Sequence, residues 1–114
     1  MDSENTFRIM IATDIHLGCY PNDPVRFDDS FNAFEETLKH SARLNADFLL
    51  LGGDLFHHSR PAQPVVFKCL RLLRQYCLGE KTSSFDIVSD QKINFAEQLK
   101  IIKNCILFFE IKYI

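Results

Sequence analysis

Two short runs of the sequence combine carboxylates and imidazoles that could hold a metal ion. The first run ends in Asp14 and His16, and the second ends in Asp54, which follows two glycines and precedes His57. In an extended segment, residues i and i+2 point to the same side, so Asp14 and His16 are expected to converge. Mixed oxygen and nitrogen ligands suit ions such as Mn²⁺ or Fe²⁺. The two runs therefore predict a metal site.

Asp54 is a candidate bridge between two metal ions. A carboxylate shared by two cations is the natural bridge of a dinuclear site, in which the ions lie roughly 3.5–4 Å apart. Two such ions clamp a phosphate, polarise the phosphorus and lower the pKa of a bound water, which then attacks at neutral pH. The glycines before Asp54 allow the backbone to turn tightly beside an ion. This combination favours hydrolysis of a phosphate ester.

Each run taken singly also has a structural explanation. An Asp-x-His triplet arises by chance in many proteins and often caps a helix, and a Gly-Asp pair at the end of a strand is commonplace. The two runs together are harder to explain in this way, because each closes a β-rich segment and a helical pattern lies between them. Their combination favours a metal site.

The elements expected around these runs form a parallel α/β layer. Residues 7–13 and 48–51 are β-rich and mostly apolar, as buried parallel strands are, and residues 85–88 are predicted to be a third strand. Residues 14–27 contain turn formers and are expected to be a loop. Strands that alternate with helices favour right-handed crossovers, and ligand sites lie at the carboxyl ends of such strands.

Two amphipathic helices are expected between the strands. The first begins at Asp28 or Asp29. Its apolar stripe is predicted to be Phe31, Phe34, Leu38 and Ala42. The second covers about residues 64–77. Its stripe is predicted to be Val66, Leu70, Leu73 and Cys77. Phe67 and Leu72 lie off that stripe, which indicates either a partner surface or a more deeply buried helix.

Composition narrows the remaining possibilities. A chain of 114 residues with 46% hydrophobic content has room for one packed domain, and a net charge of -2 gives no composition signal for nucleic acid. The four cysteines form no Cys-x-x-Cys pair, and the acidic start is unlike a secretory leader, so we expect reduced thiols in the cytosol or nucleus. No apolar run reaches the roughly 18–20 residues of a membrane span.

The end of the sequence differs in composition from the rest. Twelve of the sixteen residues 99–114 are Phe, Ile, Lys, Asn or Tyr, which AT-rich codons encode. Translated non-coding sequence accounts for this bias, and so does a real terminal strand or amphipathic helix. Both interpretations stay open.

The two runs resemble motifs of a known superfamily. Residues 14–16 are similar to the first motif of the calcineurin-like metallophosphoesterases, and residues 53–54 to the second. Longer strings resemble the DNA nucleases of eukaryotic double-strand-break repair within that superfamily. These strings are residues 4–7, 12–18, 50–57, 69–77 and 85–91. The resemblance implies a βαβαβ amino-terminal part of a metallophosphoesterase sandwich in residues 1–95, with residues 96–114 as a tail outside the family.

The resemblance also implies a role for each site residue. Asp14 and His16 would bind the first metal, and Asp54 would bridge both metals. His57 would act as a catalytic residue that positions the substrate phosphate rather than as a ligand. The second helix would pair two subunits, with Val66 in the interface. The implied cofactor is Mn²⁺, with two ions in a complete site, and the implied partners are DNA, a second copy and an SMC-like ATPase, in the nucleus and without a membrane.

Part of the family's pattern has no match in this sequence. A Gly-Asn-His-Asp motif, a further histidine and a Gly-His-x-His motif are missing. In the family they complete both metal shells and assist the leaving group. We therefore expect at most one weakly held ion and an inactive, truncated chain.

Two other functions stay open. The chain could be another calcineurin-like phosphoesterase, although phosphatases of this type follow the second Gly-Asp with Asp-Arg, and residues 55–58 here read Leu-Phe-His-His. It could also be a non-catalytic product, or a subunit that pairs with a complete nuclease.

Overall fold

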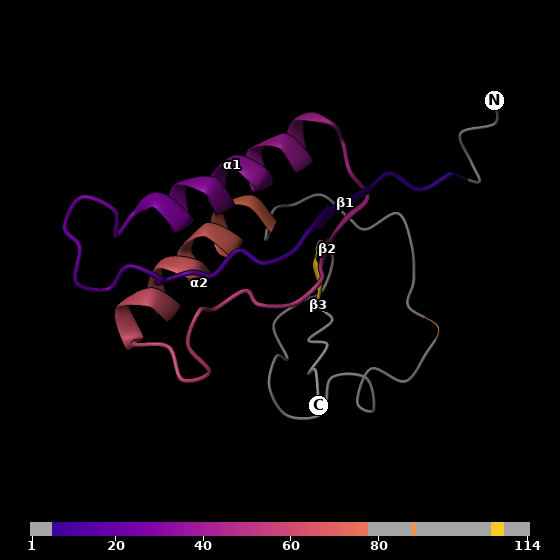
Figure 1. The fold of residues 1–114 in the computed structure, drawn as a ribbon. Coiled ribbons are helices and arrows are strands. Elements are labelled where there is room, and N and C mark those ends of the chain that lie inside the picture. The colour runs from indigo at the N-terminus through magenta and orange to yellow at the C-terminus, as the bar shows by residue number, and fades with distance from the viewer. Residues whose placement is uncertain (1–5, 78–87, 89–105, 109–114) are drawn as a thin grey trace.

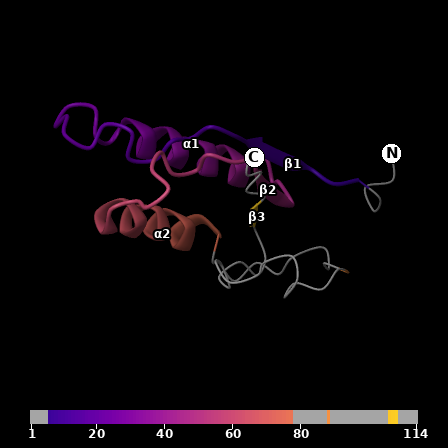
Figure 2. The same cartoon turned by 60° about the horizontal axis from the view of Figure 1, so that its bottom comes forward.

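A computed structural model describes residues 6–77, 88 and 106–108 of the chain. The elements are β1 (Ile9–Ala12), α1 (Asp29–Arg43), β2 (Phe48–Leu51), α2 (Gln63–Cys77) and β3 (Ile106–Phe108). The strands are parallel in the order β1-β2-β3, and the two helices lie side by side (Figures 1 and 2). This alternation confirms the predicted α/β class.

The sheet is buried on one face. Leu49 and Leu51 of β2 are almost completely buried and belong to one apolar core with residues of both helices. Their register partners on β1 pack against the same core, whereas Ile9 and Ile11 are 48% and 63% exposed. The first strand was predicted to be buried, and this is correct for only one of its two faces. Both helices contribute to this core and contact each other, so they lie on the same face of the sheet.

The first helix confirms most of its predicted pattern. The core contains three of the four predicted residues, namely Phe31, Phe34 and Leu38. Ala42, in the last turn, is exposed. Asp28 is the N-cap residue, but its carboxylate makes no capping hydrogen bond and pairs with Lys68 of α2 instead.

The buried residues of the second helix match its predicted stripe at only one position. Its buried residues are Val65, Cys69 and Leu73. Val66 is half-buried and Leu70 is 40% exposed, so only Leu73 of the predicted stripe is correct as a fully buried residue. Leu72 and Cys77 pack against the core, and Phe67 is 67% exposed. The helix itself carries apolar side chains around most of its circumference. The spacing of apolar residues therefore does not specify which face is buried.

Two polar contacts join the helices. The ammonium of Lys68 pairs with Asp28 and lies 4.6 Å from the ring centroid of Phe27, near the start of α1. Further along, the hydroxyl of Tyr76 donates a hydrogen bond of 2.6 Å to Glu35. That hydrogen bond lowers the pKa of Glu35 and raises the pKa of Tyr76.

The predicted third strand, residues 85–88, lies outside the described residues except for Val88, which belongs to no strand. The described third strand is β3, whose three residues lie in the compositionally distinct tail and pair with β2. The boundary placed after residue 95 also lies outside the described residues and stays a prediction.

Cys19 and Cys69 are free thiols, and Cys105 lies outside the described residues. Cys69 faces the core between the helices, where burial raises the pKa of its thiol to about 12. Neither helix in the described part of the chain has the length and apolar character to cross a membrane.

Candidate metal centre

The segments that follow β1 and β2 continue side by side beyond the strand ends. The backbone N–H of Asp14 donates to the carbonyl of Gly53 at 3.2 Å, and that of His16 donates to the carbonyl of Asp54 at 2.9 Å. These hydrogen bonds hold the two predicted metal-binding runs against each other. The runs lie at the carboxyl ends of parallel strands, as predicted from the sequence.

The core anchors both segments just past these residues. Leu17, which is 1% exposed, donates its N–H to the carbonyl of Leu55 at 2.8 Å and accepts a hydrogen bond of 3.1 Å from the N–H of His57. The N–H of Gly18 donates to the hydroxyl of Ser30, a buried residue in the first turn of α1. The position of the site is therefore tied to the helix as well as to the sheet.

The three predicted metal ligands all have left-handed backbone conformations. Their φ angles are 55° at Asp14, 51° at His16 and 50° at Asp54, and Asn45 is the only other non-glycine residue with a positive φ among the described residues. The convergence of Asp14 and His16 is confirmed, but the predicted reason was wrong. The strand ends at Ala12, and turned rather than extended backbone brings the two side chains together.

The glycines before Asp54 serve two different needs. A Cβ on Gly52 would lie 2.5 Å from Cγ2 of Thr13, so only glycine fits where the two segments approach. Gly53 has a φ of +117°, a conformation that residues with a side chain rarely adopt. Thr13 also contacts the site directly, because its hydroxyl donates to a carboxylate oxygen of Asp14 at 2.9 Å.

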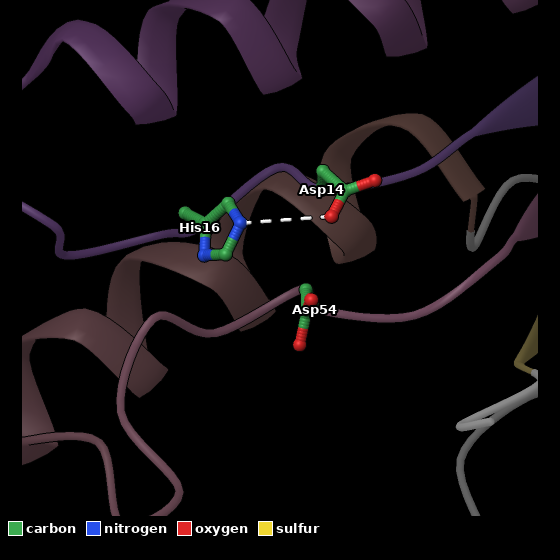
Figure 3. Close-up of side chains that lie close together, drawn as sticks. All are labelled: Asp14, His16 and Asp54. Atoms are coloured by element: carbon green, nitrogen blue, oxygen red, sulfur yellow. Dashed lines mark ion pairs between the residues drawn. The ribbon is translucent and has the colours of Figure 1, made fainter. Parts of the chain in front are cut away.

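Asp14, His16 and Asp54 form a cluster that fits a divalent cation (Figure 3). Each offers one ligand atom, and these atoms all lie within 4.8 Å of one another. Ligands about 2.0–2.2 Å from an ion lie at most about 4.4 Å apart, so small side-chain rotations would close the shell. Nε2 of His16 lies 3.7 Å from the carboxylate of Asp14. Two carboxylates and one imidazole form the mixed donor set expected for Mn²⁺ or Fe²⁺.

His57 lies beside the cluster without belonging to it. Its Nδ1 is 3.3 Å from Nδ1 of His16, and the two ring centroids are 5.3 Å apart. The exposed ring of His58 lies against His57 on another side, at 4.8 Å. His40 is on α1, where it contacts its helix neighbours Glu36 and Arg43. Of the four histidines, only His16 and His57 therefore lie at the site.

Sequence reasoning missed two residues that support the site. Ser30 fixes the segment after His16, and Thr13 fixes the carboxylate of Asp14. A serine in the first turn of a helix carries no distinctive sequence signal. The position of Thr13 next to a proposed ligand was a weak signal, which the pattern of apolar residues in the strand obscured.

Comparisons with known proteins agree with this geometry. The calcineurin-like phosphoesterase family matches residues 7–89. The chain is 50% identical over 94 residues to the double-strand break repair protein MRE11 of Gallus gallus, 48% over 95 residues to that of Homo sapiens and 46% over 94 residues to that of Arabidopsis thaliana. These alignments cover 82% to 83% of this chain but only 13% of each relative. The chain thus spans about one eighth of the length of these relatives.

Proposed function

The chain belongs to the calcineurin-like phosphoesterase family, and we propose that it is part of a Mn²⁺-dependent DNA nuclease that hydrolyses phosphodiester bonds in double-strand-break repair. The observation that carries the proposal is the cluster of Asp14, His16 and Asp54, within 4.8 Å of one another at the ends of two parallel strands. The likeness to double-strand break repair proteins supports DNA as the substrate.

The three cluster residues hold the cation in this proposal. Asp14 and His16 bind one ion, and Asp54 is placed to share its carboxylate with a second. Bound divalent ions stabilise the charge of a phosphate under attack and supply an activated water. The side chains of Asp14 and His16 are 68% and 39% exposed, so a large substrate can reach them. His57 is exposed and its Nδ1 lies 3.3 Å from Nδ1 of His16, which supports a role in donating a hydrogen bond to the substrate phosphate.

The wider assembly in this proposal is a homodimer that works with an SMC-like ATPase in the nucleus. Support for the dimer comes from α2, where Phe67 and Leu70 are exposed and Val66 is half-buried beside them. Apolar side chains gathered on one helix face favour a protein partner. The names of the relatives support a place in DNA repair, and hence in the nucleus.

A subunit that pairs but does not catalyse is the second candidate. The described residues supply only three metal ligands, and α2 offers the exposed apolar residues that pairing needs. Such a subunit would keep dimerisation and lose hydrolysis. A phosphatase or small phosphodiesterase is less well supported, because the relatives in three eukaryotes are repair proteins.

Metal affinity tests the proposed roles. Asp54→Ala should lower the affinity for Mn²⁺ more than His57→Ala does, because Asp54 is a ligand and His57 only a neighbour. Isothermal titration calorimetry of the chain measures both losses. Glu36→Ala is a matched control, since it removes an exposed carboxylate on α1 that pairs with His40. Equal losses for Asp54→Ala and Glu36→Ala would contradict the proposed metal site.

A further inference from the structure

We propose that His57 selects the tautomer of His16 that can bind a metal ion, by accepting a hydrogen bond from the Nδ1–H of His16. The inference rests on the proposed function in one respect, which is that Asp14, His16 and Asp54 form the metal site. It adds a positioning role for His57, in which this residue acts on the ion through His16.

The two ring nitrogens of His16 face different partners. Nε2 is 3.7 Å from Oδ1 of Asp14, on the side of the ring that faces the carboxylate cluster, as the dashed line in Figure 3 marks. Nδ1 is 3.3 Å from Nδ1 of His57, which comes from the segment after β2. The ring of His16 therefore lies between the candidate metal position and a second imidazole.

The chemistry of imidazole allows only one useful arrangement of protons. A neutral imidazole carries one N–H, and the nitrogen that binds a metal must carry none. If Nε2 of His16 is the ligand, Nδ1 has to carry the proton. Nδ1 of His57 must then be the acceptor, which places the proton of His57 on its own Nε2. The reverse arrangement would direct the N–H of His16 toward the cation and prevent binding.

The backbone fixes His57 in the place that this role requires. Its N–H donates to the carbonyl of Leu17 at 3.1 Å, and Leu17 is almost completely buried. Leu17 directly follows the left-handed turn at His16, and its neighbour Gly18 is tied to Ser30 of α1. The two rings meet at 66°, so one ring edge is presented to the other. Ligand histidines commonly gain their orientation and tautomer from a second hydrogen bond of this kind.

The same arrangement accounts for both proposed roles of His57. Its acceptor Nδ1 faces His16, and its N–H is left on Nε2, across the ring from that contact. Nε2–H is a donor, as contact with a phosphate oxygen requires. One tautomer of His57 therefore serves the metal ligand and the substrate at once.

Nitrogen NMR of the ion-free 114-residue chain tests the inference directly. Histidine-labelled protein at a pH of about 8, where ordinary imidazoles are neutral, reports which nitrogen carries each proton. We expect Nδ1–H at His16 and Nε2–H at His57. Free imidazole side chains in water favour Nε2–H, so the form expected at His16 is the unusual one. A proton on Nε2 of His16 would overturn the proposal, and this measurement needs no variant.

Variants separate the positioning role from simple loss of a side chain. His57→Ala should return His16 to the Nε2–H form and lower Mn²⁺ affinity about tenfold, as loss of such a supporting hydrogen bond typically does. His57→Asn should keep both properties near those of the unmodified chain, because its amide oxygen can occupy the place of Nδ1. His58→Ala is the matched control and should change neither property.

The outcomes distinguish this inference from the proposed function. An unchanged tautomer and unchanged affinity in His57→Ala would overturn the role of His57 while leaving the metal site intact. Unchanged Mn²⁺ affinity in Asp54→Ala would instead contradict the metal site, and the ion-free spectra would still decide whether His57 accepts from His16. A loss in His57→Asn as large as that in His57→Ala would also count against the proposed hydrogen bond.

Discussion

Backbone strain is concentrated at the residues that would bind the cation. Left-handed conformations cost a non-glycine residue on the order of 1–3 kcal/mol, and aspartate and histidine accept them more readily than most. Asp14, His16 and Asp54 keep these conformations because backbone hydrogen bonds and the buried Leu17 hold the two segments together. The fold thereby holds the three side chains together as a cluster.

The close approach of Gly52 to the side chain of Thr13 leads to a testable prediction. Gly52→Ala should destabilise the chain by about 1–3 kcal/mol, because the added methyl group would meet Cγ2 of Thr13 at 2.5 Å. Thr13→Ser removes that methyl group and keeps the hydroxyl that donates to Asp14. The double variant should therefore recover much of the stability lost in Gly52→Ala, as thermal unfolding measures.

Gly53→Ala provides the contrast. Apart from Gly53 and its two chain neighbours, no heavy atom lies within 4 Å of the position of the added Cβ, so the cost comes from the φ of +117°. Thr13→Ser should not rescue this variant. Equal rescue of both alanine variants would show that the contact with Thr13 is not the cause.

At the scale of the elements, polar contacts fix the helix pair that supports the site. Lys68 bridges to the start of α1, and Tyr76 bridges to Glu35 in its middle. The start of α1 also carries Ser30, which holds the segment after His16. The placement of α1 therefore affects the cluster of Asp14, His16 and Asp54 through Ser30.

The contact between Tyr76 and Glu35 predicts a pH dependence. The pKa of Glu35 is lowered, so its stabilising contribution is present above the ordinary value near 4.5 and is lost as the pH falls through the lowered pKa. The pKa of Tyr76 is raised, so its contribution is present below 10.0 and is lost as the pH rises. Tyr76→Phe should lower the melting temperature at neutral pH. It should also reduce the loss of stability at both acidic and alkaline pH.

Melting temperatures across the acidic and alkaline ranges measure this effect. Tyr20→Phe is the matched control, because the hydroxyl of Tyr20 contacts Arg26 in a loop rather than the other helix. A pH profile that is the same in Tyr76→Phe as in the unmodified chain would show that the bond adds nothing to stability.

The exposed face of α2 predicts the effect of charge on assembly. Val66→Asp should convert a dimer to a monomer in sedimentation velocity, because an unpaired carboxylate at an apolar interface is costly. Phe67→Asp should do the same with less effect on folding, since Phe67 is 67% exposed in the single chain. Val25→Asp changes a residue that is 84% exposed outside α2 and should leave the dimer intact. A dimer that survives both α2 substitutions would place the interface elsewhere.

At the scale of the whole molecule, the described part of the chain covers only one face of its sheet. Ile9 and Ile11 of β1 are 48% and 63% exposed. Exposed apolar strand residues reduce the margin of stability, which is small even in complete domains. This exposure makes a low stability of the isolated chain the physical expectation.

The same incompleteness predicts that the chain by itself does not hydrolyse DNA at a useful rate. Three ligands can hold one cation loosely, and among the described residues a second cation would have only Asp54. Stabilisation of the attacking and leaving oxygens together requires both ions. Loss of an acid that assists the leaving group typically lowers the reaction rate by a further factor of about 10²–10⁴.

Labelled duplex and single-stranded DNA with Mn²⁺ provide the assay. Product formation by the chain should equal that of a control with Asp14→Ala and Asp54→Ala. Cleavage well above this control would show that three ligands suffice.

The convergence of Asp14, His16 and Asp54 and most of the first helix follow from sequence patterns alone. Asp14, His16 and Asp54 could be predicted because the ends of parallel strands meet at one edge of a sheet whatever the details of packing. Phe31 and Phe34 could be predicted because a single apolar stripe leaves one choice of buried face. Both inferences need only local pattern and a general rule of topology.

Features that depend on contacts between distant segments could not be predicted in this way and are visible only in the folded chain. The buried face of α2 falls on Val65 rather than Val66 because α1 and the sheet select one of several apolar faces. His16 and His57 are 41 residues apart in sequence, and their ring contact exists because Leu17 ties the two segments together. Such contacts depend on the relative placement of whole elements, which periodicity within one segment cannot specify.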